Sequence, residues 1–173
     1  MKINKSVEEV LSKQVNAEFW SANMYLSMSS WFMEKGLKGF ANWMRVQYQE
    51  ENAHALKLFD FILERQGSVK LMALDAVPTD WNSILEVMEE TYKHECKVTA
   101  MIYNCIDVAE KDKDRATVSM LQWYVDEQIE EEANVDDLIN QLKLIGEDGQ
   151  GIYHLDKELA TRVFVDPTQP AAN

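Results

Sequence analysis

Residues 47–59 read QYQEENAHALKLF, and they place two glutamates and a histidine inside a long segment with helical periodicity. Counted at about 100° per residue from Phe40, Glu51 lies at about 20° and His54 at about −40°. Leu58 falls on the same stripe of the predicted helix. Glu51 and His54 therefore occupy positions that should face a hydrophobic core, where a charged group needs a partner.

The rest of the chain has the composition and periodicity of an all-α protein. It has 173 residues, of which 46% are hydrophobic, with only 6 Gly and 3 Pro. Periodicity and capping residues predict four long helices and a short fifth one. The first, second, fourth and fifth should cover residues 6–35, 39–66, 114–145 and 153–164. The third should begin at a cap formed by Thr79 or Asp80 and end at residue 111. Ser6 and Glu9 should form a capping box at the start of the first helix. We expect one four-helix bundle domain over residues 1–165 and a flexible tail at 166–173.

The loops predict how the helices are connected. Turns of about two or three residues join the first helix to the second and the third to the fourth, so each pair should be an antiparallel hairpin. Residues 67–80 lie between the hairpins and, at about 3.3 Å per residue, can span the bundle as one long crossover. Five apolar residues of this loop are expected to pack on the bundle or against another subunit: Val69, Leu71, Met72, Leu74 and Val77.

The chain is strongly acidic, with 17 Lys and Arg against 30 Asp and Glu and a formal net charge of −13. This charge repels nucleic acid and anionic membranes and favours metal ions or basic partners. The sequence shows no apolar run of about 18 residues and no basic leader, so we expect a cytoplasmic protein that spans no membrane. Cys96 and Cys105 lie on opposite sides of one predicted helix and should remain free thiols.

The other three long helices also carry a carboxylate on or beside their apolar stripes. Glu18 and Glu95 lie at about 20° on the first and third stripes. On the fourth helix Gln128 lies on the stripe and Glu131 at its edge. All of these residues, like the pair in the second helix, lie within about 4.5 Å of their helix midpoints along the axis. In a bundle of parallel and antiparallel helices they should meet at one level.

Four carboxylates buried together need compensation, because each buried ion costs several kcal/mol. Two divalent cations would balance the four charges, and protonation of the carboxylates is the alternative. Oxygen donors with one imidazole suit iron, manganese or zinc, and a four-helix bundle is the usual setting of di-iron and di-manganese centres. The sequence therefore predicts a dinuclear metal site.

These residues together resemble the ferritins, most closely the haem-free bacterial type, over about residues 3–165. The residues that carry the resemblance are Glu18 followed by Tyr25, Glu51-x-x-His54, Glu95 within YKHE, and LQWYVDEQIEEE at 121–132. The ferroxidase-centre residues that the resemblance implies are Glu18, Glu51 and His54 for one iron, and Glu95 and Glu131 for the second, with Gln128 close by. It also implies that Glu51 bridges the two irons and that Tyr25 is an electron donor beside them.

The resemblance implies a third, accessory iron site at Glu50, Glu127 and Glu130.

The chain departs from related families at informative positions. Where stable di-iron proteins have a second Glu-x-x-His motif, this chain has Gln128-x-x-Glu131, which predicts weaker and more exchangeable binding of the second iron. Asn52 replaces the methionine that haem-binding relatives have, so no haem is expected. Val118 and Leu121 replace acidic channel residues, so the route by which iron reaches the centre is not predicted.

The function that the resemblance implies is iron storage with ferroxidase activity. Iron(II) would be oxidised by O2 or H2O2 and stored as iron(III) mineral inside a shell of 24 identical chains. Two alternatives remain open at this point. A helical interaction protein, such as a cytokine-like bundle with one crossover, would show no iron uptake. A di-iron oxygenase or reductase would keep two irons without growing a mineral.

Overall fold

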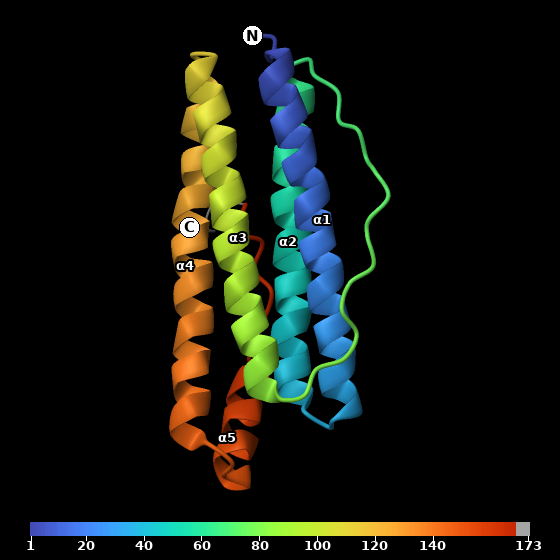
Figure 1. Ribbon diagram of the computed structural model, residues 1–173, viewed down its shortest axis with the longest axis vertical. Helices are drawn as coiled ribbons and strands as arrows, with labels where there is room; N and C mark the ends of the chain where they lie inside the picture. Colours follow the sequence, from blue (N-terminus) through green and yellow to red (C-terminus); the bar gives the residue numbers. More distant parts are fainter. Residues whose placement is uncertain (169–173) are drawn as a thin grey trace.

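The computed structural model describes residues 1–168. Its helices are α1 (Lys5–Glu34), α2 (Lys38–Glu64), α3 (Ile84–Lys111), α4 (Arg115–Ile145) and α5 (Gly149–Leu159). The first four lie side by side along one axis, with α5 at one end (Figure 1). This confirms the predicted all-α bundle with a short fifth helix. Within residues 1–168, no helix has the length and apolar character that a membrane crossing requires.

The long loop between α2 and α3 runs the length of the bundle, which confirms the predicted crossover (Figure 1). The side chain of Asn16 fixes its course, because Nδ2 donates to the Lys70 carbonyl at 2.8 Å and Oδ1 accepts from the Met72 amide at 2.8 Å. Val69 and Val77 pack against the core. The other three apolar loop residues are exposed, namely Leu71, Met72 and Leu74. For these three, contact with another subunit stays a prediction.

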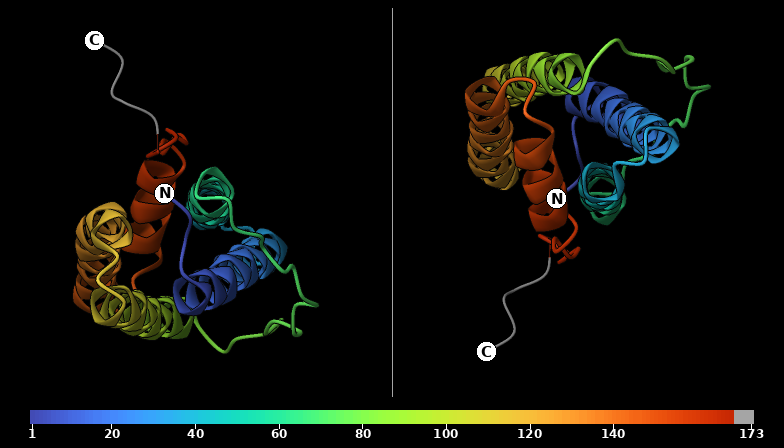
Figure 2. Two further views of the ribbon diagram at one scale, coloured as in Figure 1. Left: turned by 90° about the horizontal axis from the view of Figure 1, so that it is seen from above. Right: turned by 90° about the horizontal axis from the view of Figure 1, so that it is seen from below.

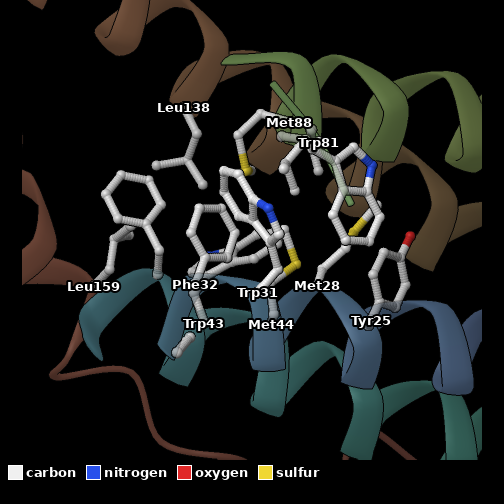
Figure 3. Packing of buried hydrophobic residues seen from close by; sticks show 14 of the residues in the cluster. Tyr25, Met28, Trp31, Phe32, Trp43, Met44, Trp81, Met88, Leu138 and Leu159 are labelled. Atoms are coloured by element: carbon white, nitrogen blue, oxygen red, sulfur yellow. The ribbon is translucent and has the colours of Figure 1, made fainter. Parts of the chain in front are cut away.

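The interior contains two apolar clusters, one at each end of the bundle. Figure 3 shows the cluster next to α5, in which Trp31, Phe32 and Met44 pack closely and Tyr25 lies at one side. The second cluster is built around Leu11, Leu58, Ile102 and Leu121, among others. Along each helix, the charged residues predicted to face the core lie between the residues of these two clusters. The polar level is therefore bounded by apolar packing on both sides.

Two predicted helix starts were wrong, because the capping side chains have other partners. α1 begins at Lys5, and its Asn4 cap makes no side-chain hydrogen bond. Ser6 Oγ instead donates to the Asp112 carboxylate in the turn between α3 and α4. α3 begins at Ile84 with Ser83 as its cap, since Ser83 Oγ accepts from the Glu86 amide at 3.0 Å. Asp80, an expected cap, accepts from Trp31 Nε1 at 3.1 Å and so anchors the end of the loop.

α5 differs from the prediction at both ends. It begins at Gly149, because Asp148 accepts hydrogen bonds from two backbone amides of its first turn, and it ends at Leu159. Gly39 of α2 has no Cβ, which leaves room for the backbone of Asp156 in α5 and lets the Gly39 amide donate to Asp156 Oδ1 at 2.7 Å. Residues 160–166 are not helical. Of the predicted flexible tail at 166–173, residues 169–173 lie outside the described residues.

Both cysteines are free, as predicted, with Cys105 buried and Cys96 partly buried. The same α3 helix that separates them also carries Glu95 into the interior. Seen along the bundle axis, α5 lies between α2 and α4 (Figure 2). The chain that follows α5 therefore starts beside the two helices that contribute the motifs Glu51-x-x-His54 and Gln128-x-x-Glu131.

Candidate metal centre

Four helices each bring one carboxylate to the level between the two apolar clusters. Glu18 of α1, Glu51 of α2, Glu95 of α3 and Glu131 of α4 are buried, with at most 6% of any side chain exposed. His54 is 2% exposed. The structure thus buries the four residues that the helical periodicity placed on or beside the core stripes. Their role as metal ligands stays a prediction.

Glu18, Glu51 and His54 form the first half of the centre. Among residues 1–168 this is the one group of three His, Cys, Asp or Glu residues whose ligand atoms all lie within 4.8 Å of one another. Glu18 Oε2, Glu51 Oε2 and His54 Nε2 are buried and have no hydrogen-bond partner among the described residues. Buried polar atoms without partners are costly and rare in native proteins. Their arrangement fits a cation that would accept electron pairs from all three residues.

Glu95 and Glu131 form the second half, in which the carboxylates already have partners. Glu95 accepts hydrogen bonds from the Tyr25 hydroxyl and from Gln128 Nε2, the latter at 3.0 Å. Glu131 Oε2 accepts from Gln47 Nε2 at 2.8 Å. These two carboxylates do not form a three-residue group of the kind seen in the first half. Neutral donors therefore satisfy the second half in this state of the protein.

Burial changes the protonation of the centre. It raises the pKa of Glu18 and raises that of Glu51 well above its ordinary value, and for Glu51 the neighbouring Glu18 charge acts in the same direction. Burial and the Glu131 charge raise the pKa of Glu95 to about 8. Burial lowers the pKa of His54 to about 4, so its imidazole is neutral at neutral pH and able to bind a metal. These shifts favour the protonated form of the buried carboxyl groups, and a cation that binds them competes with those protons.

Tyr25 is fully buried, and its pKa lies well above the ordinary value because of burial and the Glu95 charge. Its hydroxyl therefore carries a proton at neutral pH and donates it in a hydrogen bond to Glu95. The ring stands edge-on to His94, with ring centroids 6.1 Å apart. Tyr25 thus touches a predicted ligand of the second metal, and its role as an electron donor stays a prediction.

The three residues predicted for the accessory site are not gathered into one group. Glu127 Oε2 lies 3.9 Å from His54 Nε2, beside the first half of the centre. Glu50 is partly buried on the flank of α2 and forms an ion pair with Arg162 at 2.8 Å. Glu130 is exposed. Burial raises the pKa values of Glu50 and Glu127 to about 7 each.

Several residues at or near the centre do not appear among the predicted site residues, including Gln14, Gln47, Tyr124 and Arg162. Gln14 Nε2 donates to Glu18 Oε1 at 2.9 Å, and Gln47 donates to Glu131. Both glutamines lie on core stripes at about −20°, so the criterion that identified the glutamates could have found them. Tyr124 donates to the His54 carbonyl at 2.7 Å. Arg162 falls within the predicted fifth helix, but in the structure it lies in the non-helical segment after α5, so its predicted facing direction does not apply.

Comparison with known proteins identifies the family. The sequence pattern of the ferritin-like domain matches residues 8–145, which include all four long helices except the first residues of α1. The chain belongs to the ferritin family. This confirms the resemblance seen in the sequence, and it makes iron storage the function that the family supports.

Individual ferritins match nearly the whole chain. A bacterial non-heme ferritin of Bacteroides fragilis is 39% identical over 160 residues, covering 92% of this chain and 99% of the relative. One from Staphylococcus saprophyticus is 40% identical over 162 residues, covering 94% and 97% respectively. The open pore ferritin of Archaeoglobus fulgidus has a structure that matches with a TM-score of 0.92 at 50% identity, covering 94% of this chain and all of that one. The fold and the four-helix setting of the site are thus those of a ferritin.

Proposed function

We propose that this ferritin oxidises iron(II) at the buried centre and deposits iron(III) mineral inside a cage of 24 chains. The observation that carries the proposal is the set of three unpartnered buried atoms, Glu18 Oε2, Glu51 Oε2 and His54 Nε2, next to two further buried carboxylates. Buried away from solvent, such atoms favour binding of a divalent cation. Membership of the ferritin family favours iron storage over the two alternatives, a helical interaction protein and a di-iron oxygenase or reductase.

In this proposal, the first iron binds to Glu18, Glu51 and His54. Glu51 is shared with the second iron, which binds to Glu95 and Glu131. Gln128 and Gln47 hold these last two carboxylates in place through their hydrogen bonds. Two divalent ions carry four positive charges, which balance the four buried carboxylates once their protons have left.

The electrons of the reaction come from the iron ions. Each iron(II) gives up one electron, so a pair supplies the two electrons that convert O2, with two protons, into H2O2. Where H2O2 is the oxidant, two electrons from another pair of iron(II) ions and two protons convert it into two molecules of water. Where one iron(II) is bound alone, Tyr25 is the proposed source of the second electron, since its hydroxyl contacts Glu95. The protein contributes the placement of the ions and the surrounding charge.

The second iron has oxygen ligands only, because Gln128 and Glu131 replace the second Glu-x-x-His motif. We expect this iron to exchange more readily, which suits a centre that passes oxidised iron on to a mineral. Glu50, Glu127 and Glu130 are the proposed accessory site on that path. No haem is part of the proposal, and a cytoplasmic location stays a prediction.

The experiment that tests the proposal combines assembly size with iron loading. Iron(II) is added in air to the purified protein, followed by size-exclusion chromatography with mass detection and iron analysis. A particle of about 480 kDa, which is 24 times the chain mass of 20.0 kDa, that accumulates many irons per chain is expected. A monomer or dimer would contradict the cage. A particle that keeps two irons per chain under excess iron, without mineral growth, would favour the oxygenase or reductase alternative.

A further inference from the structure

Arg162 lies outside the helices, in the segment that follows α5 and packs against α2. Asn42 Nδ2 fixes the backbone of this segment by donating to the Leu159 carbonyl at 3.1 Å and to the Arg162 carbonyl at 2.9 Å. The guanidinium of Arg162 lies over the Trp43 ring, 4.7 Å from its centroid. Arginine on an aromatic face and with a fixed backbone has little freedom to move. The charge is therefore held at one place beside α2.

The guanidinium contacts two side chains that lead to the metal centre. Its Nη2 lies 2.8 Å from Glu50 Oε2, and its Nη1 donates to Gln47 Oε1 at 2.5 Å. A guanidinium has only donors, so it requires the carbonyl oxygen of the Gln47 amide to face it. The NH2 group of the same amide then faces Glu131 and donates to it at 2.8 Å. Arg162 thus sets the orientation of the amide that holds a ligand of the second metal.

Arg162 contacts one of the three carboxylates of the proposed accessory site, namely Glu50. Glu50 is a proposed accessory-site ligand, and the charges of Glu131 and Glu127 both act on it. A fixed guanidinium and a divalent cation at the same carboxylate repel each other and compete for the same oxygen atoms. Binding of one therefore weakens the binding of the other to Glu50.

We propose that Arg162 is a resident counter-ion that competes with the third metal ion for Glu50 and so limits how tightly the accessory site binds. A cation that binds there must displace the guanidinium, which releases Gln47 and removes one of the attachments that hold the segment after α5 against α2. This inference rests on the proposed accessory site and concerns its regulation. A purely structural role for Arg162 predicts a loss of stability on substitution but no gain in metal affinity.

The test uses zinc(II), which cannot be oxidised, so that binding is separated from ferroxidase chemistry. Zinc is titrated by calorimetry into the assembled, metal-free protein at one fixed pH. In Arg162→Gln the affinity for the third ion should rise about tenfold, a change equivalent to about 1.4 kcal/mol, while the first two ions change little. Adding Glu50→Gln to that variant should remove the gain. An unchanged or lower third-ion affinity in Arg162→Gln overturns the proposal.

Arg45 offers the matched control, since it is an exposed arginine of α2, the helix that carries Glu50, and stacks on Tyr48. Arg45→Gln removes the same charge from the chain and should leave the affinity for all three ions unchanged. A gain equal to that of Arg162→Gln would show a general charge effect and would contradict competition at Glu50. If the unaltered protein binds no zinc at the buried carboxylates, the proposed function itself fails.

Hydrogen exchange of the unaltered protein gives a second test that does not depend on folding of a variant. Amides of residues 160–166 should exchange faster when zinc fills the accessory site, because the guanidinium has left its partners. Glu50→Gln should show no such zinc-dependent change. Exchange that stays the same or slows in the unaltered protein on saturation with zinc overturns the proposal. Arg162→Lys, which keeps the charge but loses the fork geometry, should raise the third-ion affinity less than Arg162→Gln.

Discussion

The two halves of the metal centre are equally buried but differ in what their carboxylates contact. In the first half Glu18, Glu51 and His54 each keep one buried atom without a hydrogen-bond partner. In the second half Tyr25, Gln128 and Gln47 donate to Glu95 and Glu131. A metal entering the first half finds three buried ligand atoms that no neutral donor occupies, whereas one entering the second half must compete with neutral donors.

This difference explains how one site can both capture a cation and let one go. In the metal-free protein, buried polar atoms without a hydrogen-bond partner lower the stability of the folded state. Metal binding gives these atoms a partner and removes that cost. Satisfied carboxylates lose less when the metal leaves, because their donors return to them. We therefore expect the first half to bind tightly and the second half to exchange.

Replacement of Glu51, which both halves are expected to share, should have the largest effect. Glu51→Gln should slow iron(II) oxidation by more than about 100-fold, beyond the range seen when only a supporting residue is lost. The metal-free protein should become more stable by on the order of 1–3 kcal/mol, because a buried carboxyl without a partner becomes a neutral amide. Stopped-flow oxidation and thermal unfolding measure the two changes.

Glu64→Gln is the control for this substitution, since Glu64 is an exposed glutamate of the same helix. It should leave both the rate and the stability unchanged. An unchanged oxidation rate in Glu51→Gln would show that the centre lies elsewhere.

The next effect separates the two halves by affinity. Zinc titration of the metal-free protein should show a tighter and a weaker step, with affinities that differ by about tenfold or more. His54→Ala should abolish the tighter step, and Glu131→Gln should weaken mainly the other. The comparison fails if both substitutions weaken the same step, because the two halves would then not be distinct sites.

The stability of the metal-free protein should depend on pH through the raised carboxyl pKa values. A carboxyl whose folded pKa is raised adds stability below its unfolded pKa and loses it as pH rises to the folded value. For Glu95 this range extends from the ordinary 4.5 to about 8. The free energy of unfolding should therefore fall across this range by up to about 1.4 kcal/mol per pH unit for each such group.

Urea unfolding at several pH values, with and without zinc, measures this dependence. The metal-bound protein should lack the decline, because metal binding requires the carboxylates to have lost their protons. Glu95→Gln should reduce the slope in the metal-free protein. Stability that rises between pH 5 and 8 without metal would contradict the assigned protonation.

The smallest effect concerns the donor beside the second half. Tyr25→Phe removes one hydrogen bond to Glu95 and should lower stability by about 0.5–1.5 kcal/mol. Zinc affinity in the first half should not change, since Tyr25 donates to Glu95 rather than to the first group. Calorimetry of this variant would contradict the account if the tighter step were weakened as strongly as the other.

Much of the fold followed from periodicity, because periodicity reports which way a residue faces. Glu18, Glu51 and Glu95 stand out as charges on apolar stripes, and the structure buries all three. The long loop and the short turns set the topology through their lengths alone. Facing direction and chain length are local properties that a sequence carries directly.

Partner choice was harder to predict, since it depends on residues far apart in the chain. Ser6 bonds to Asp112 rather than capping its own helix, and Asp80 anchors Trp31 rather than starting α3. Arg162 reaches Gln47 and Glu50 from a segment without regular structure. In each case the residue type indicated that the side chain would form a polar contact. It did not indicate whether the partner would be near or distant in the sequence.

Anomalous X-ray diffraction from crystals loaded with iron(II) in the absence of oxygen tests the central claim most directly. The account predicts two iron peaks inside the bundle, one beside Glu18, Glu51 and His54 and a less occupied one beside Glu51, Glu95 and Glu131. Crystals that take up iron but show no peak among these buried carboxylates would contradict it.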